Sequence, residues 1–453
     1  MVKVIDGGIM AAAGYSVASA RVGIKPTGNN RDLTLIKSDV PAGVAGTFTR
    51  NKVKAAPVLW DTEVVAHGIA SAIVINTGIA NAATGDQGYE NSKIEAETVA
   101  ESLNVPSDQV LVASTGVIGP QLPIDKITTG IKFLSGEMTG VPYKGTAVLR
   151  EYFSGTKANA YMEANEAAKA IMTTDTVPKE FAVEFTLGGK TCHIGAMCKG
   201  SGMIHPNMGT MLGFLLSDVS IDTAFAQKLL KYVVERTFNM VSVDGDTSTN
   251  DTLVWLNNGL AGNNLITADG MGISLDDIDE TGNIDIKTSV SNKNISPDFI
   301  ELYNALYMVC EHLAKNIAMD GEGATRLLTA KVVGAPDYET AKILAKSIIT
   351  SNLTKAAIYG RDANCGRIFC AMGYSGADFD PAKTDITMVS ENGSIKLIEN
   401  GMLPEFDEEE ALKILTPKEI TAICNINNGS FEAEAWGCDL THEYVTINAD
   451  YRS

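Results

Sequence analysis

The stretch from Lys199 to Asp218, KGSGMIHPNMGTMLGFLLSD, constrains the fold more than any other part of this chain. Its first half is small and polar and contains Pro206, whereas residues 211–216 are almost entirely apolar, as in a buried strand or the start of a buried helix. Gly209 and Thr210 lie at the junction of the two halves. We therefore expect the chain to pass from a flexible polar segment directly into the protein core.

The junction itself suits a chemical reaction. Gly209 has no Cβ atom, so the backbone there can adopt strained conformations and a neighbouring group can approach its carbonyl closely. Attack of the Thr210 hydroxyl on the Gly209 carbonyl would cut the chain and leave Thr210 with a free α-amine. A threonine that uses its own α-amine as base is a recognised activated nucleophile. An ordinary loop that leads into a core strand, with Thr210 as a turn or N-cap residue, accounts for the same residues.

A second junction follows the apolar run QVLVAS at residues 109–114. We expect this run to form a strand that leads directly into Thr115 and Gly116. A hydroxyl and flexible backbone N–H groups at the end of a strand are the fixed donors from which an oxyanion hole is built. A plain glycine turn after a strand also fits, so both interpretations stay open at this point.

Apolar periodicity and turn residues predict a chain that alternates between strands and helices. Residues 1–60 have the pattern of loops and short strands, with strands at DLTLIKSD and GVAGTFTR. Further strands are expected at 71–76, 181–185, 194–197 and RLLTAKVV. Helices are expected at 89–103, 160–172 and 337–349. Two more helices are expected to begin after the caps Asp222 and Ser296, the second with Pro297 in its first turn. Asn392-Gly393 and Asn428-Gly429 predict two hairpins in the C-terminal tail.

The charge balance and the cysteines exclude several classes of function. The chain of 453 residues has 36 Lys and Arg against 55 Asp and Glu, a net charge of −19, whereas nucleic-acid-binding surfaces are basic. It has no run of about 18 apolar residues that would predict a transmembrane helix, and its glycine-interrupted N-terminus is a poor signal peptide. The seven widely spaced cysteines suit reduced thiols. We therefore expect a cytoplasmic protein without nucleic-acid or membrane partners.

Three motifs suggest metal or phosphate binding, but each lacks residues that such a site requires. The cysteine–histidine cluster at 192–198 lacks a second cluster that would complete a tetrahedral zinc site. In DGDTSTNDT at 244–252, Thr249 and Trp255 occupy the positions where a calcium loop needs glycine and glutamate, so a packed polar turn or a shell around an active site fits better. The GGKT at 188–191 lacks the first glycine of the phosphate-loop pattern. We therefore expect no metal.

Together these landmarks resemble one family along essentially the whole chain, the glutamate N-acetyltransferases, or ornithine acetyltransferases, of arginine biosynthesis. The matching stretches follow the order of the family: VKAAPVLW, STGVIG, IMTTDTVPK, KGSGMIHPNMGTML, VDGDTSTNDT, MDGEGATR, DANCGRI and YVTINADY. None of them suffices alone, but eight in one order are specific.

The resemblance implies a precursor that cuts itself between Gly209 and Thr210. The products would be an α chain, residues 1–209, and a β chain, residues 210–453, which stay associated, as an α2β2 heterotetramer. Many relatives have alanine before the cut, and the glycine of this chain keeps the small size. The implied fold is an α/β sandwich of the self-processing aminopeptidase type, residues 1–285, followed by a second α/β domain, residues 286–453.

The implied reaction is a ping-pong acetyl transfer without a cofactor. The Thr210 hydroxyl attacks the acetyl carbonyl of N-acetylornithine while its α-amine takes the proton, and ornithine leaves. Glutamate then attacks the acetyl-threonine ester through its amine. Thr115 and Gly116 would form the oxyanion hole. Some members of the family also accept acetyl-CoA, which is therefore a second candidate donor substrate.

The resemblance also assigns the substrate-binding residues, besides Thr210. Lys199 would bind a substrate carboxylate, Thr173 would contribute a hydroxyl and Glu322 would bind a substrate amine. Asn448 and Ser453 match positions at which the family brings its C-terminus into the site.

Two other functions fit parts of this pattern. An aminopeptidase or amidase of the same self-processing architecture would pass the acyl group to water, although Lys199 and Glu322 suit a charged amino acid as acceptor. A self-cleaving or uncut binding protein without activity would not need the intact KGSGM and STGVIG stretches around Thr210.

Overall fold

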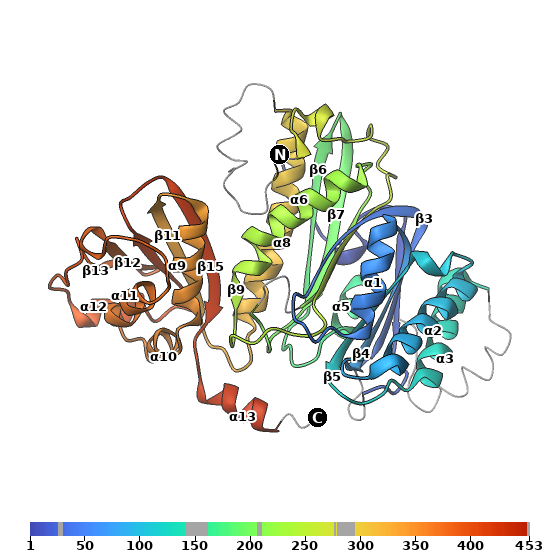
Figure 1. Cartoon of the computed structure of the whole chain (residues 1–453), viewed down its shortest axis with the longest axis horizontal. Helices are drawn as coiled ribbons and strands as arrows, with labels where there is room; N and C mark the ends of the chain where they lie inside the picture. The colour runs from blue at the N-terminus through green and yellow to red at the C-terminus, as the bar shows by residue number, and fades with distance from the viewer. Residues whose placement is uncertain (26–29, 142–161, 206–210, 276–277, 279–294, 451–453) are drawn as a thin grey trace.

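The computed structural model describes residues 1–25, 30–141, 162–205, 211–275, 278 and 295–450. Within these residues, helices pack against two mixed β-sheets, a larger one on the right of Figure 1 and a smaller one on the left. This arrangement confirms the predicted α/β class. In the same part of the chain, every helix is too short or too polar to cross a membrane.

The larger sheet has β8 and β10 in its middle. Among the described residues it contains nine strands in the order β1-β6-β7-β8-β10-β3-β4-β5, with β2 paired to β3. β8 runs antiparallel to β7 and parallel to β10, which runs antiparallel to β3. The strands are β1 (Lys3–Val4), β2 (Tyr15–Ala20), β3 (Leu33–Phe48), β4 (Ile69–Ile79), β5 (Val110–Val117), β6 (Lys179–Leu187), β7 (Lys190–Lys199), β8 (Leu212–Ser217) and β10 (Thr252–Asn257).

β8 explains the long apolar run that the sequence shows after residue 210. Leu215 belongs to the core on one face of the sheet, which α6 and α8 share. Leu212, Phe214 and Leu216 belong to the core on the opposite face. Both faces of β8 are therefore buried, and a strand buried on both faces is continuously apolar instead of alternating.

Helices pack on both faces of the larger sheet, and two of them begin at the predicted caps. Asp222 accepts a hydrogen bond from the Phe225 N–H at 2.9 Å, and Ser296 accepts one from the Asp298 N–H at 3.3 Å. Both are N-cap interactions that satisfy a free N–H of the first turn. The helices are α1 (Ala56–His67), α2 (Gly85–Leu103), α3 (Ile124–Thr139), α5 (Ala164–Ala170), α6 (Thr223–Arg236) and α8 (Pro297–Met319).

The smaller sheet is built mainly from the C-terminal part of the chain. Its six strands among the described residues have the order β13-β12-β14-β11-β15-β9. They are β9 (Val241–Ser242), β11 (Leu327–Ala335), β12 (Asp385–Ser390), β13 (Gly393–Ile398), β14 (Glu419–Asn425) and β15 (Phe431–Cys438), and the accompanying helices are α9 (Tyr338–Thr350), α10 (Asn352–Gly360), α11 (Cys365–Gly373), α12 (Glu408–Ile414) and α13 (His442–Asp450). The proposed domain boundary at 285/286 lies outside the described residues and stays a prediction.

One of the two predicted hairpins is wrong. The turn at Asn392-Gly393 does join two paired strands, β12 and β13. The strands on either side of Asn428-Gly429, β14 and β15, instead flank β11, which is parallel to β14 and antiparallel to β15. A Cβ atom on Gly429 would lie 2.2 Å from the Ala335 carbonyl oxygen at the end of β11. The glycine therefore allows the chain to cross a third strand closely instead of making a tight turn.

The first 60 residues also differ from their prediction. The two short strands expected there are one strand, β3, with a register shift between Lys37 and Ala42. The helix α1, which was not predicted, starts at Ala56. Its helical pattern is weak in the sequence because Leu59 lies on the exposed face, 46% exposed, while Asp61 is buried.

Asp61 on α1 and Glu95 on α2 are neighbouring buried carboxyl groups. The Val112 N–H donates to Asp61 Oδ1 at 2.8 Å, whereas neither side-chain oxygen of Glu95 has a hydrogen-bond partner among the described residues. Burial, and next the nearby Asp61, raise the pKa of Glu95 from 4.5 to about 8. Burial likewise raises the pKa of Asp61. Glu95 is therefore mostly protonated in the folded protein near neutral pH.

Replacing Glu95 by glutamine should remove part of the pH dependence of stability. The pKa of Glu95 is about 8 in the folded protein, above the ordinary 4.5. Below pH 4.5 the carboxyl is protonated in both the folded and the unfolded protein and does not change the free energy of unfolding. As the pH rises from 4.5 through 8, the free energy of unfolding falls, because the unfolded protein ionises this group more readily. At pH 7 this ionisation lowers the free energy of unfolding of the wild type by about 3 kcal/mol, a loss that the neutral amide of glutamine does not have. Urea unfolding at about pH 5, 7 and 8 measures this difference.

Glu101→Gln, at an exposed position of the same helix, is the matched control and should leave the pH dependence unchanged. A wild type and an E95Q variant with parallel stability curves across this pH range would contradict the prediction.

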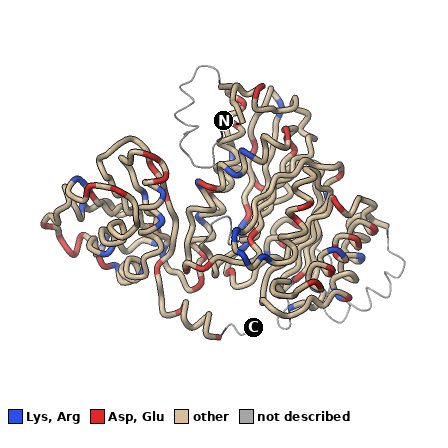
Figure 2. Tube along the Cα trace, viewed as in Figure 1, with Lys and Arg blue, Asp and Glu red and all other residues tan. Residues whose placement is uncertain are grey.

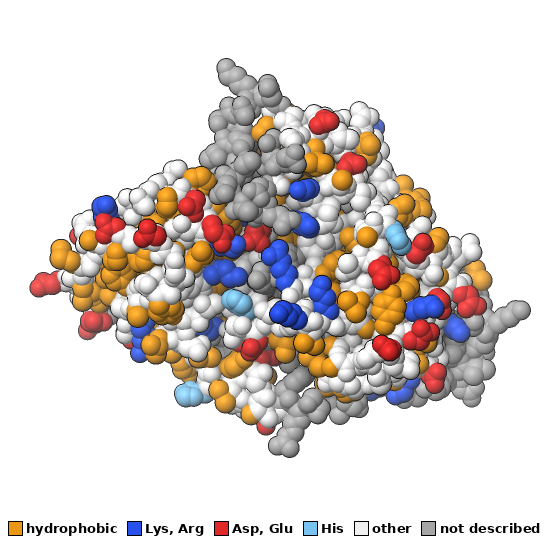
Figure 3. Space-filling view, viewed as in Figure 1, with side chains coloured by type: hydrophobic (Ala, Val, Ile, Leu, Met, Phe, Trp, Pro, Cys, Tyr) orange, Lys and Arg blue, Asp and Glu red, His pale blue; other side chains and the backbone are white. Residues whose placement is uncertain are grey.

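Charge is unevenly distributed over the surface. Asp and Glu are scattered along both sheets and their helices, whereas many Lys and Arg gather near the centre of the face shown in Figures 2 and 3. A local gathering of cations in a chain with a net charge of −19 indicates a region suited to anions.

Candidate active site

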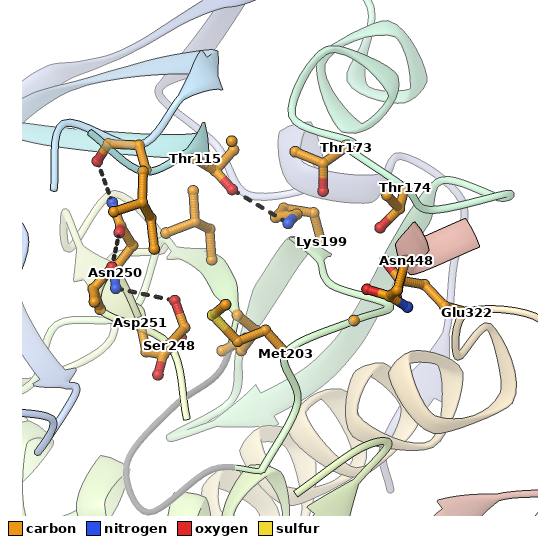
Figure 4. Close-up of a pocket in the computed structure, with 17 residues that line it drawn as sticks. Thr115, Thr173, Thr174, Lys199, Met203, Ser248, Asn250, Asp251, Glu322 and Asn448 are labelled. Carbon is orange, nitrogen blue, oxygen red and sulfur yellow. Dashed lines mark hydrogen bonds between the residues drawn. The ribbon is translucent and has the colours of Figure 1, made fainter. Parts of the chain in front are cut away.

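A cavity of about 160 Å³ lies where the ends of β5 and β7, the start of β8 and the segment before β10 meet (Figure 4). Its walls include every predicted site residue that the structure describes. These are Thr115, Gly116, Thr173, Lys199, Glu322 and Asn448. The structure thus brings together side chains that are up to about 330 positions apart in the sequence, as expected of a site assembled by the fold.

Three predicted site residues, Gly209, Thr210 and Ser453, lie outside the described residues. The described residues that directly follow residue 210, Met211 and Leu212, line the cavity. The chain therefore enters β8 from the cavity wall. The roles assigned to all the site residues stay predictions at this point.

Thr115 and Lys199 contact each other across the cavity. The Lys199 Nζ donates to Thr115 Oγ1 at 3.3 Å, drawn in Figure 4. An ammonium group has donors only, so the Thr115 oxygen accepts this bond and its own hydroxyl proton stays available for another acceptor. Burial lowers the pKa of the Lys199 ammonium, while the carboxylates of Asp175 and Glu322 oppose this shift.

Gly116 allows an unusually close approach of two strands. Its φ angle is +129°, a conformation that favours glycine, and it lies opposite Gly78 in the parallel pairing of β4 with β5. A Cβ atom at position 116 would lie 2.3 Å from the Gly78 carbonyl carbon. Any side chain there would push the two strands apart and move the backbone that lines the cavity.

A buried ion-pair network fixes the backbone beside the cavity. Asp175 Oδ1 accepts from Lys179 Nζ and from the Gly200 N–H, both at 2.7 Å, and Asp175 Oδ2 accepts from the Thr173 N–H at 3.0 Å. Lys179 also pairs with Asp320 at 2.5 Å. Although burial opposes it, two nearby lysines hold the pKa of Asp175 at about 2. The network was not predicted, and its one sequence signal is the spacing of an aspartate and a lysine four residues apart.

Glu322 and Asn448 lie at the other end of the cavity from Thr115 (Figure 4). The Asn448 Nδ2 donates to Glu322 Oε2 at 2.8 Å, which brings α13 to the site. The Glu322 N–H donates to the Ser201 carbonyl at 2.9 Å. Gly202 leaves room for this side chain, because a Cβ there would lie 2.3 Å from the Glu322 carboxyl. A carboxylate and a buried ammonium in one small cavity suit an amino-acid ligand that carries both charges.

The polar segment before β10 forms one wall of the site. Residues 248–251 all line the cavity, as expected if this segment is a shell around an active site. The Asn250 Nδ2 donates to the Ala80 carbonyl at 2.5 Å and to the Ser114 carbonyl at 2.8 Å. The segment is therefore fixed to the ends of both β4 and β5, next to Thr115.

Asp251 is a cavity residue that was not predicted from the sequence. It is 1% exposed, and its Oδ2 has no hydrogen-bond partner among the described residues. Burial raises the pKa of this carboxyl, and hydrogen bonds from Ser248 and from the Met211 backbone oppose the rise. The Asp251 carboxyl is therefore hydrogen-bonded to the backbone of Met211, the residue that follows position 210. Its only sequence signal is its place at the end of a polar run.

The described side chains contain no group of three or more His, Cys, Asp or Glu placed to hold a metal ion. The seven cysteines are all free, which agrees with the expected reduced thiols. The described residues that line the cavity carry hydroxyl, ammonium, carboxyl and amide groups.

Comparison with known proteins gives a consistent set of similarities. Residues 16–453 match the model of the ArgJ family. The chain is 46% identical to arginine biosynthesis bifunctional protein ArgJ 1 of Clostridium acetobutylicum, over 95% of this chain and 94% of that protein. It is 43% identical to arginine biosynthesis bifunctional protein ArgJ of Caldanaerobacter subterraneus subsp. tengcongensis, over 100% of both. The crystal structure of ArgJ from Bacillus halodurans is 39% identical and covers 52% of this chain and 97% of that one, with a TM-score of 0.45.

Proposed function

Because this chain belongs to the ArgJ family of arginine biosynthesis enzymes, we propose that it transfers the acetyl group of N2-acetyl-L-ornithine to L-glutamate. One observation carries the proposal: the Thr115 hydroxyl, the Lys199 ammonium and the Glu322 carboxylate surround a single cavity at the start of β8. The cavity thus combines a hydrogen-bond donor with two opposite charges beside Met211, which follows the predicted nucleophile Thr210 in the sequence.

The two charges suit the substrate. N2-acetylornithine has an α-carboxylate, which Lys199 would bind, and a free amine, which Glu322 would bind together with Asn448. Thr173 would add a hydrogen bond from its hydroxyl. Ion pairs formed inside a buried cavity are stronger than those in water, so each charge contributes to positioning the acetyl group. Ser453 would complete this set from the C-terminus.

Thr210 is the proposed nucleophile. Cleavage between Gly209 and Thr210 gives Thr210 a free α-amine, whose ordinary pKa of about 7.7–8.0 suits a base near neutral pH. The Thr210 oxygen forms an ester with the acetyl carbon, the acetyl C–N bond breaks and the proton passes through the α-amine to the departing ornithine. Asp251 is hydrogen-bonded to the backbone of Met211, the residue that follows Thr210 in the chain.

Thr115 and Gly116 would stabilise the oxyanion of each tetrahedral intermediate. The hydroxyl proton of Thr115 is available because Lys199 already donates to its oxygen. The removal of one such donor typically costs about 3–4 kcal/mol of transition-state stabilisation. The backbone N–H of Gly116 would be the second donor.

Glutamate completes the reaction by attacking the acetyl-threonine ester through its amine, which releases N-acetylglutamate and restores the Thr210 hydroxyl. No cofactor takes part in these steps. The same ester forms when acetyl-CoA is the donor and its thiol leaves in place of ornithine, and we propose acetyl-CoA as the second donor.

The two chains, residues 1–209 and 210–453, are proposed to stay together as an α2β2 heterotetramer in the cytoplasm. Their association is supported by the larger sheet, in which β8 and β10 of the second chain lie between β7 and β3 of the first. Separation of the chains would therefore break strand pairing on two sides.

The proposal is tested by incubating the purified protein with N-acetylornithine in the presence and absence of glutamate. We expect continuous ornithine release and N-acetylglutamate formation only when glutamate is present. Acetate release at the same rate without glutamate would instead identify the aminopeptidase or amidase activity. Mass spectrometry of the same sample measures processing, and an active protein that stays a single chain of 48.0 kDa would refute the threonine mechanism.

A further inference from the structure

A second and larger hollow, of about 450 Å³, lies between α1 and α6 over the end of β3. We call it the basic groove. Its floor is residues 46–48 of β3, its walls come from α1 and α6, and Arg50 and Lys54 line it from the segment between β3 and α1. Its volume falls in the range of small-molecule pockets, whereas the catalytic cavity of about 160 Å³ is smaller.

The basic groove has a surplus of positive charge. Among the described residues that line it, Arg50, Lys54 and Lys231 carry positive charge and Glu235 is the one carboxylate. That carboxylate is already engaged, because it forms a salt bridge with Lys342 of α9 and accepts from Asn239 Nδ2 at 2.6 Å. The described lining of the groove is therefore basic as a whole. Its charge favours a ligand with more than one negative group.

The floor of the groove offers backbone donors as well. β4 pairs with β3 as far as Gly43, and the Val44 N–H donates to the Gly68 carbonyl at 3.1 Å, so this edge of β3 is open only after Val44. The Gln227 side chain covers part of this edge, since it donates to the Gly46 carbonyl and accepts from the Gly46 N–H, both at 2.9 Å. Hydrogen-bonding direction alternates along a strand, so the N–H of Phe48 points the same way. It is a further donor for an anion.

One side of the groove is apolar. Phe48, Val65 and Ala66 contribute to its lining, together with the aliphatic part of Lys231. A simple inorganic anion would gain nothing from these side chains. The lining therefore favours a ligand that joins a flat apolar group to several phosphates, as a nucleotide does.

The basic groove lies close to the catalytic cavity. In the larger sheet, Leu212 of the cavity is in register with Thr252, which is in register with Phe48 of the groove. Two strand spacings separate the two sites, or about 10 Å. The Thr49 N–H also donates to the carbonyl of the cavity residue Asp251 at 3.0 Å. A ligand with a long flexible arm could therefore occupy the groove and reach the cavity.

We propose that the basic groove binds the nucleotide end of acetyl-CoA. The 3′-phosphate and the diphosphate would interact with Arg50, Lys54 and Lys231, the adenine would lie against the apolar wall, and the thiol-bearing arm would carry the acetyl group towards the cavity. This inference rests on the proposed use of acetyl-CoA as second donor. N-acetylornithine carries no phosphate and gains nothing from the groove.

The double variant Lys54→Glu and Lys231→Glu tests the proposal with both donors in the same enzyme. We expect KM for acetyl-CoA to rise by about tenfold or more, since each tenfold corresponds to only about 1.4 kcal/mol of binding. KM for N-acetylornithine should stay within about twofold. The matched control, Lys413→Glu with Lys418→Glu, reverses two exposed charges in and beside α12 and should change neither constant. Equal rises for both donors in the groove variant would overturn the proposal.

Isothermal titration with 3′,5′-ADP measures the groove directly and does not depend on turnover. We expect saturable binding to the wild type and at least about a tenfold weaker affinity in the double variant. Pyrophosphate that binds as tightly as 3′,5′-ADP, or 3′,5′-ADP that does not bind, would overturn the nucleotide assignment. A wild type that binds 3′,5′-ADP but makes no N-acetylglutamate from acetyl-CoA would instead refute the second donor and leave the groove as a nucleotide site.

Discussion

Replacing Thr210 by alanine should leave the chain uncut and without acetyltransferase activity. The variant keeps a small side chain but lacks the hydroxyl that is proposed first to attack the Gly209 carbonyl and later to accept the acetyl group. Loss of the nucleophile from a comparable hydrolase lowers kcat on the order of a millionfold, and a similar fall is expected here. Mass spectrometry of the purified protein measures cleavage, and acetyl transfer from N-acetylornithine to glutamate measures activity.

Thr210→Ser is the matched control, because serine keeps both the hydroxyl and, after cleavage, the α-amine. This variant should still yield the two chains, residues 1–209 and 210–453, and retain measurable transfer. An alanine variant that is cut, or that transfers acetyl groups at near the wild-type rate, would refute Thr210 as nucleophile. The remaining groups of the cavity, such as Lys199, would then have to provide another route.

Replacing Thr115 by valine should lower kcat by about 100- to 1,000-fold, the usual cost of removing one oxyanion donor. Valine has nearly the same shape as threonine, so the end of β5 keeps its packing while the hydroxyl is lost. KM for N-acetylornithine should change little, because the oxyanion develops only in the transition state. Steady-state kinetics with both constants determined separately measures the effect.

Thr174→Val provides the comparison within the same cavity. Thr174 also lines the cavity, but its hydroxyl is hydrogen-bonded to Ser201 Oγ at 2.8 Å. Its loss should leave kcat within about tenfold of the wild type, since it removes one neutral hydrogen bond of about 1 kcal/mol. Similar falls in kcat for both variants would contradict the assignment of Thr115 to an oxyanion hole and indicate general disturbance of the cavity.

Elements whose signals are local could be predicted from the sequence. The caps Asp222 and Ser296 need only the N–H groups of the next residues, so α6 and α8 begin where expected. The hairpin at Asn428-Gly429 could not be judged in this way, because the strand that separates its two sides, β11, starts about 100 residues earlier. α1 was missed for a similar reason. Its Asp61 is buried, and the N–H of Val112, which is distant in the sequence, donates a hydrogen bond to this carboxyl.

The site residues also divide into those that sequence motifs indicated and those whose role depends on the fold. The order of short motifs indicated Thr115, Lys199 and Glu322, and the structure places them around one cavity. Asp175 and Asp251 were missed because their contribution depends on burial, and a carboxylate within a polar run resembles a solvent-exposed one in the sequence. Burial follows from the packing of β7, β8 and β10 against each other, which the fold supplies.

The place of β8 and β10 between β7 and β3 would have a consequence for the lifetime of an enzyme processed as proposed. A cut between residues 209 and 210 would convert one polypeptide into two whose strands are interleaved in a single sheet. Neither piece could leave without breaking two hydrogen-bonded ladders, so dissociation would require unfolding. Once unfolded, the pieces would have to meet again in solution, and recovery would become second order and slow in dilute samples. The mature enzyme would thus owe its persistence to a slow rate of unfolding, and heat inactivation would be effectively irreversible even where the uncut precursor refolds.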